Sequence, residues 1–149
     1  MSSHSLEDAA AAKRSNRPRL LVIDDEPGNL LTFKRVLRQV YDITLASSGA
    51  EALALFATGE TPFDVMIVDY AMPIMNGAQL LLKVRQQHPG LPCIFLTAHA
   101  ELPEVQAAGR ENGVVAIILK PWERADIERW VEQSLRIASM KRSIVGMRT

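Results

Sequence analysis

The sequence has almost no cysteine, no long apolar run and no excess of charge of either sign. Cys93 is the only cysteine in 149 residues, which excludes an internal disulfide and a cysteine-based zinc site. No apolar stretch reaches the ~18 residues of a membrane-spanning helix, and the N-terminus lacks the apolar core of a secretory signal. These absences favour a cytoplasmic protein that does not insert into a membrane. Cys93 itself begins a predicted buried strand, where we expect a small apolar core residue.

The charge balance and composition limit the function classes further. The chain carries 17 basic and 17 acidic residues, a formal net charge of zero. Proteins that bind nucleic acid directly usually carry net positive charge, so we expect no direct nucleic-acid binding. Hydrophobic residues make up 48% of the chain, which excludes a wholly disordered protein. One domain with a substantial core is predicted.

The chain divides into three predicted segments. Residues 1–18 lack apolar periodicity and are predicted to form a flexible arm, in which Arg14 and Arg17, with Arg19 just beyond, are candidates for contact with an acidic partner. Residues 19–138 form the predicted domain. Residues 139–149 form a C-terminal tail or linker with three uses left open: extension of the last helix, pairing with another copy as a homodimer, or the start of a linker.

Within the domain, short apolar runs alternate with segments of helical periodicity. Strands are predicted at 19–23, 42–46, 65–69, 93–96 and within 114–119, and helices at 27–40, 50–58, 77–88, 102–111 and from about 123. Five strand–helix pairs require parallel strands with right-handed crossovers. The predicted fold is therefore an α/β, (βα)5 doubly wound five-stranded parallel sheet with strand order 2-1-3-4-5, which is flavodoxin-like.

Polar residues follow four of these strands, where open α/β sheets place their sites. The residues are Asp24 and Asp25 after the first strand, Asp69 at the end of the third, Thr97 after the fourth and Lys120 after the fifth. Clustered carboxylates repel one another unless a cation joins them, and oxygen ligands suit Mg²⁺. With Mg²⁺ and Lys120 neutralising charge, Asp69 can act as a nucleophile towards a phosphoryl group. For the acidic pair alone, a solvated loop that caps the next helix is the alternative.

These residues lie in short motifs that together resemble the receiver domain of two-component response regulators, including the chemotaxis regulators. The matching motifs are Leu21-Val22-Ile23-Asp24-Asp25-Glu26, Asp69-Tyr70-Ala71-Met72-Pro73 with Met75-Asn76-Gly77, Leu96-Thr97-Ala98, and Lys120-Pro121. Each motif is weak alone, but four in order at strand ends are specific. The resemblance covers about residues 19–137.

The resemblance implies a role for each matching position. Asp69 matches the phosphoacceptor, and Asp24 and Asp25 match the acidic pair that binds Mg²⁺. The metal's other protein ligands would be Asp69 and the backbone carbonyl of Ala71. Thr97 matches the switch hydroxyl, and Lys120 the lysine that pairs with phosphoryl oxygens. The bond from Lys120 to Pro121 is expected to be cis.

The sequence departs from the family pattern at one position and has two candidate tuning positions. Ile117 stands where many receivers have an aromatic switch residue, three positions before Lys120. We therefore hypothesise that switching runs mainly through Thr97 and the following helix, where Gly109 adds mobility. In the family, the positions of Ala71 and His99 line the approach of water and tune the phosphate's lifetime. An exposed loop residue is the alternative for His99.

The expected function is that of a phosphoacceptor in a two-component phosphorelay. The phosphoryl group would come from a histidine kinase or phosphotransfer protein, and a downstream output protein or domain would read the result. The chain would not be an enzyme beyond assisting its own phosphorylation and dephosphorylation. A haloacid-dehalogenase-type phosphatase is disfavoured because Ala71 replaces its second aspartate. A non-phosphorylated receiver-like scaffold is the remaining alternative.

Overall fold

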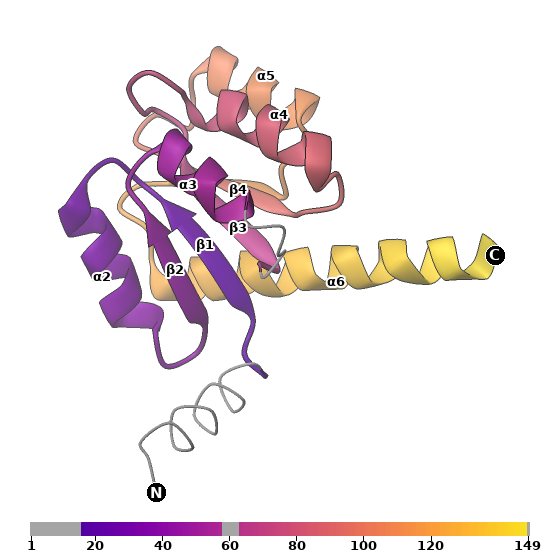
Figure 1. Cartoon of the computed structure of the whole chain (residues 1–149). Coiled ribbons are helices and arrows are strands. Elements are labelled where there is room, and N and C mark those ends of the chain that lie inside the picture. Colours follow the sequence, from indigo (N-terminus) through magenta and orange to yellow (C-terminus); the bar gives the residue numbers. More distant parts are fainter. Residues whose placement is uncertain (1–15, 58–62, 149) are drawn as a thin grey trace, which may run out of the picture.

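Five parallel strands form one sheet in the order β2-β1-β3-β4-β5. The computed structural model describes residues 16–57 and 63–148, with side chains through residue 142, so most of the predicted arm lies outside the described residues. The strands are β1 Arg19–Ile23, β2 Asp42–Ala46, β3 Val65–Asp69, β4 Cys93–Thr97 and β5 Ala116–Leu119. The predicted fold class and strand order are confirmed (Figure 1).

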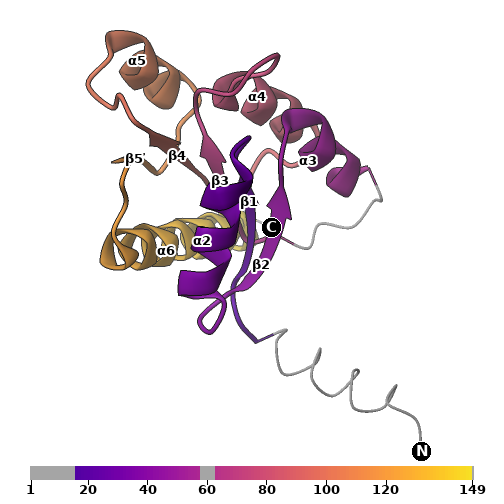
Figure 2. The same cartoon turned by 90° about the vertical axis from the view of Figure 1, so that its left-hand side faces the viewer.

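Helices cover both faces of the sheet. They are α2 Pro27–Leu37, α3 Gly49–Phe56, α4 Gly77–Gln87, α5 Pro103–Glu111 and α6 Arg124–Arg148. Helices α2 and α6 lie on one face, and α3, α4 and α5 lie on the other (Figure 2). This arrangement follows from strands that are apolar on both sides, because each face must then be covered. It leaves the C-terminal ends of the strands as one open edge.

Two apolar cores result, one on each face of the sheet. Leu21, Met66 and Phe95 belong to the core under α3 and α4. Leu20, Ile67 and Ile94 belong to the core under α2 and α6. Adjacent residues of one strand thus enter opposite cores, as the period of two in a strand requires. Cys93 is fully buried in the first core, which confirms its predicted place.

Local capping signals determine where several helices begin. Asn76 and Gln79 form a capping box at the start of α4, in which each side chain accepts a hydrogen bond from the other residue's backbone N–H. Ser48 caps α3 by accepting from the N–H of Glu51 at 3.0 Å. Pro27 lies in the first turn of α2, where a missing N–H costs nothing.

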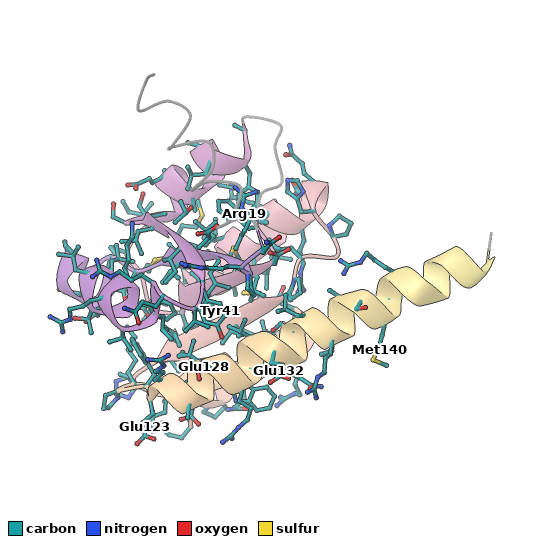
Figure 3. All side chains as sticks on the ribbon, turned by 90° about the horizontal axis from the view of Figure 1, so that it is seen from below. Arg19, Tyr41, Glu123, Glu128, Glu132 and Met140 are labelled. Atoms are coloured by element: carbon teal, nitrogen blue, oxygen red, sulfur yellow. The ribbon has the colours of Figure 1, made fainter. Side chains whose placement is uncertain are left out.

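The last helix is longer than the predicted domain. Helix α6 runs for 25 residues without a break from Arg124 to Arg148, so the expected boundary near residue 138 falls inside it. Of the three predicted uses of the tail, the structure shows extension of the helix. Its last turns project past the sheet, with the exposed Met140 beyond the body of the domain (Figures 1 and 3). In the described part of the chain, no helix is both long and apolar enough to cross a membrane.

Candidate functional site

Lys120 joins two buried carboxylates at the C-terminal edge of the sheet. Its Nζ lies 3.0 Å from Oδ2 of Asp69 and 3.2 Å from Oδ2 of Asp24. Only 3% of Asp24 and 6% of Asp69 is exposed, whereas the side chain of Lys120 is 22% exposed. These residues come from the ends of β1, β3 and β5 and meet because parallel strands end at the same edge. The structure thus brings these three predicted residues together.

The proton affinities at the site follow from burial and from these contacts. Burial raises the pKa of Asp69 above its ordinary 3.8, and the negative charge of Asp24 adds to this, although the hydrogen bond and charge of Lys120 pull the pKa down. For Lys120, burial lowers the pKa, but its contacts with Asp69 and Asp24 raise it by more. The lysine therefore stays charged while it faces the two carboxylates.

Asp25 completes a group of three carboxylates. Ligand oxygens of Asp24, Asp25 and Asp69 all lie within 4.8 Å of one another. Asp25 is exposed, whereas Asp24 already accepts hydrogen bonds from the Glu26 N–H at 2.9 Å and from Nδ2 of Asn29 at 3.2 Å. Three carboxylates at this spacing form a donor set that suits a hard divalent cation such as Mg²⁺.

Asn29 was missed by the sequence-based prediction. Its side chain orients Asp24 from the first turn of α2. The sequence contains one signal that could have identified Asn29: it is the third residue of a helix that directly follows an acidic cluster.

Two further residues of the predicted site, Thr97 and Ala71, make hydrogen bonds in the loops that follow β4 and β3. Thr97 is buried at the end of β4, and its hydroxyl accepts a hydrogen bond from the backbone N–H of His99 at 3.1 Å. Within the described residues, that hydroxyl has no hydrogen bond to Asp69 or Lys120. The N–H of Ala71 donates to Oδ1 of Asp69 at 3.2 Å. The loop after β3 thus holds the carboxylate that Lys120 contacts from the other side.

The loop after β5 adopts the expected geometry. The bond from Lys120 to Pro121 is cis, which confirms that prediction. Trp122 then turns towards α2, where its ring lies 5.0 Å from that of Phe33. A hollow of about 570 Å³ opens between α2 and this loop, and both Asp24 and Lys120 line it. Asp24 and Lys120 are therefore reachable from the surface through this hollow.

The candidate tuning residue His99 lies in the loop after β4, and the candidate switch residue Ile117 lies within β5. The side chain of His99 is 67% exposed, and its Nδ1 lies 3.6 Å from Oε1 of Glu101. Ile117 is half-buried against α5, where Gly109 gives it room. A Cβ added at Gly109 would lie 2.7 Å from Cδ1 of Ile117. Close packing therefore explains this glycine, whereas the mobility we had assigned to it stays a prediction.

A family profile for the response regulator receiver domain matches residues 20–132. The match covers well over half of the chain and includes every residue of the site. The protein therefore belongs to the receiver domains of two-component response regulators.

Known relatives agree with this assignment. Transcriptional regulatory protein GlrR of Escherichia coli is 34% identical over 123 residues, which are 81% of this chain and 27% of GlrR. A structure described as adenylate cyclase from Rhodopirellula baltica matches with a TM-score of 0.80 at 30% identity, covering 88% of this chain and 96% of that one. A receiver domain protein from Clostridium thermocellum matches with a TM-score of 0.76 at 28% identity, covering 83% and 98%. The chain thus spans about a quarter of GlrR.

Proposed function

We propose that Asp69 accepts a phosphoryl group from a histidine kinase or a phosphotransfer protein, and that the chain signals through the phosphorylated state. The observation that carries this proposal is the contact of Lys120 with both Asp69 and Asp24 at 3.0 and 3.2 Å. A lysine so placed offsets the charge that opposes attack by a carboxylate on an anionic phosphoryl group.

The transfer is a single displacement at phosphorus. An oxygen of the Asp69 carboxylate forms the new P–O bond, the P–N bond of the donor phosphohistidine breaks, and the released imidazole takes up a proton. The product is an acyl phosphate on Asp69. Lys120 stays charged throughout because its pKa is raised, and its Nζ can follow the phosphoryl oxygens as charge builds on them.

Mg²⁺ fits the donor set of the site. Asp25 and Asp69 would hold it directly with the backbone carbonyl of Ala71, and Asp24 would act through water because its oxygens already accept from Glu26, Asn29 and Lys120. The ion would supply positive charge to the phosphoryl oxygens. Before it binds, Lys120 is the only cation bonded to Asp69 among the described residues.

The phosphoryl group would be read at the surface through two neighbours of the site. Thr97 would turn its hydroxyl from the His99 N–H towards a phosphoryl oxygen, and the loop from β4 into α5 would follow. Ile117 packs on α5, so α5 and β5 would move together. The partner that reads this change is a downstream output protein or domain.

We further propose that the chain catalyses no reaction besides its own phosphorylation and dephosphorylation and that it works in the cytoplasm. By resemblance to the family, the small Ala71 and the exposed His99 would flank the approach of water to the phosphoryl group. Ala71 leaves room for water, whereas His99 can steer or block it, so these two positions would determine how long the phosphoryl group survives.

The test is the mass of the intact chain after treatment with acetyl phosphate, with and without Mg²⁺. We expect a gain of one phosphoryl group that requires Mg²⁺ and is lost in Asp69→Asn. Asp126→Asn, at a partly exposed aspartate on α6, is the matched control and should gain the same mass as the wild type. No gain in the wild type under any condition would favour the scaffold instead.

A further inference from the structure

The outer side of α2 carries a concentration of positive charge that phosphoryl transfer does not use. Leu31, Lys34, Arg35 and Arg38 follow one another at intervals that place them on one side of the helix, and all four are exposed. Arg17 joins them, because its Nη1 donates to the backbone carbonyl of Arg38 at 3.0 Å. We call these five residues the basic stripe. The chain as a whole has no net charge, so the positive charge of the basic stripe is a local concentration.

The cations of the basic stripe have no acidic partner in the described part of the chain. The ion pairs there involve other residues, and none includes Arg17, Lys34, Arg35 or Arg38. Helix α2 itself contains no acidic residue. Cations in the last turn of a helix are favoured by its dipole, which accounts for part of this pattern. The dipole does not account for Leu31, which is 66% exposed beside them.

Two hollows flank the cations. One of about 320 Å³ is lined by Leu31, Lys34, Arg35 and Arg38 together with Thr32. The other, of about 450 Å³, is lined by Arg17, Lys34 and Arg38 and continues past Tyr41 to β2. Lys34 and Arg38 line both hollows, so they stand between an apolar recess at Leu31 and the edge strand of the sheet. Neither residue lines the hollow beside Asp24 and Lys120.

We propose that the basic stripe is a docking surface for an acidic segment of a partner protein, with one apolar side chain of that segment seated against Leu31. Acidic side chains would pair with the cations that have no partner within this chain, and burial of Leu31 would add an apolar contact.

A nucleic-acid backbone suits this surface less well than an acidic protein segment. It would leave Leu31, which is 66% exposed, without an apolar partner. The proposed interaction does not depend on phosphorylation of Asp69.

The test is amide NMR on the full ¹⁵N-labelled chain, titrated with a short synthetic peptide in which one leucine is flanked on each side by acidic residues. We expect shifts confined to residues 31–38 and Arg17. Binding should weaken several-fold when asparagine replaces the peptide's leucine, and about tenfold in Lys34→Glu/Arg38→Glu, because charge complementarity and the apolar contact both contribute.

The matched control is Lys83→Glu/Arg110→Glu, which makes the same charge change at two exposed residues on α4 and α5. This control should bind the peptide as the wild type does, and both variants should melt with the same cooperativity. Equal loss in both variants, or no shift on α2, would overturn the proposal.

The same experiments would also detect two other occupants of the basic stripe, nucleic acid and a second copy of this chain. A DNA duplex that shifts the same amides at lower concentration than the peptide would replace the acidic segment with nucleic acid. Sedimentation of the free chain that shows a dimer broken by Lys34→Glu/Arg38→Glu would replace it with a second copy. Either result would contradict the proposal.

Discussion

At the scale of single residues, the site keeps a buried carboxylate in a state that costs stability. Asp69 is 6% exposed and lies near the charge of Asp24. Its contact with Lys120 offsets only part of the cost, because the pKa of Asp69 remains raised. A reactive carboxylate needs such surroundings, since a fully stabilised one would be a poor nucleophile.

This cost predicts a dependence of stability on pH. The raised pKa of Asp69 means that the folded state holds its proton more tightly than the unfolded state does, with an unfolded value near 3.8. Its contribution to stability is therefore fully present below that value and is lost as pH rises through the raised pKa. Asparagine does not ionise, so the Asp69→Asn variant does not lose stability in this way. At neutral pH its unfolding free energy should exceed that of the wild type by about 1 kcal/mol.

The measurement is urea unfolding of both proteins without Mg²⁺, from below pH 3.8 up to neutral pH. The difference in unfolding free energy should grow across that window. Asp126→Asn serves as the control, because its aspartate lies in an ion pair with Arg129 at a partly exposed position. A difference between Asp69→Asn and wild type that stays constant with pH would contradict the assignment of the cost to ionisation.

At the scale of elements, the contact between α5 and β5 depends on one glycine. Gly109 is buried, and an added Cβ would lie 2.7 Å from Cδ1 of Ile117 and 3.2 Å from Cγ2 of Val114. The end of the Ile117 side chain therefore occupies the space that a Cβ at position 109 would take, and we call this space the notch.

Gly109→Ala should therefore destabilise the protein, although alanine is the better helix former. Overpacking typically costs ~1–3 kcal/mol, and the gain in helix propensity returns at most ~1 kcal/mol. Adding Ile117→Val removes Cδ1 and should recover most of the loss, so the two changes should be non-additive in thermal unfolding. Gly28→Ala in α2 is the control, because nothing lies within 4 Å of its added Cβ. Additive effects of the two changes would show that the notch is not what matters.

At the scale of the whole molecule, the long helix α6 has a packed first half and an exposed end. Its first half covers the sheet, where Ile127 and Val131 are fully buried. Beyond residue 138 it leaves the sheet, and residues 139–142 are exposed.

We predict that a chain ending after residue 138 keeps its fold. The loss in unfolding free energy should stay within about 1 kcal/mol, as for other changes at exposed positions, and phosphorylation by acetyl phosphate should be unchanged. A chain ending after residue 126 is the contrast, because it loses the buried Ile127 and Val131 and should not fold cooperatively. Loss of cooperative unfolding in the longer chain would place the end of the domain further along α6.

Most of the fold followed from local patterns in the sequence. Apolar runs of strand length and helices of regular period determine which elements form, and a parallel sheet with short connections leaves few topologies. Boundaries were less exact: β4 includes Thr97, and α3 ends at Phe56 rather than residue 58. Helix and strand ends depend on capping contacts that a periodic pattern does not contain.

The sequence by itself determined that Asp24, Asp25, Asp69 and Lys120 share one edge, because strand ends in this topology always meet there. Tertiary structure alone decided what each side chain contacts: Lys120 reaches two carboxylates, Asn29 orients Asp24, and Ile117 fills the notch at Gly109. It also left the cations of α2 without acidic partners in the described part of the chain. Backbone order follows from local chemistry, whereas pairings across the sheet depend on side-chain distances that exist only after the elements have packed.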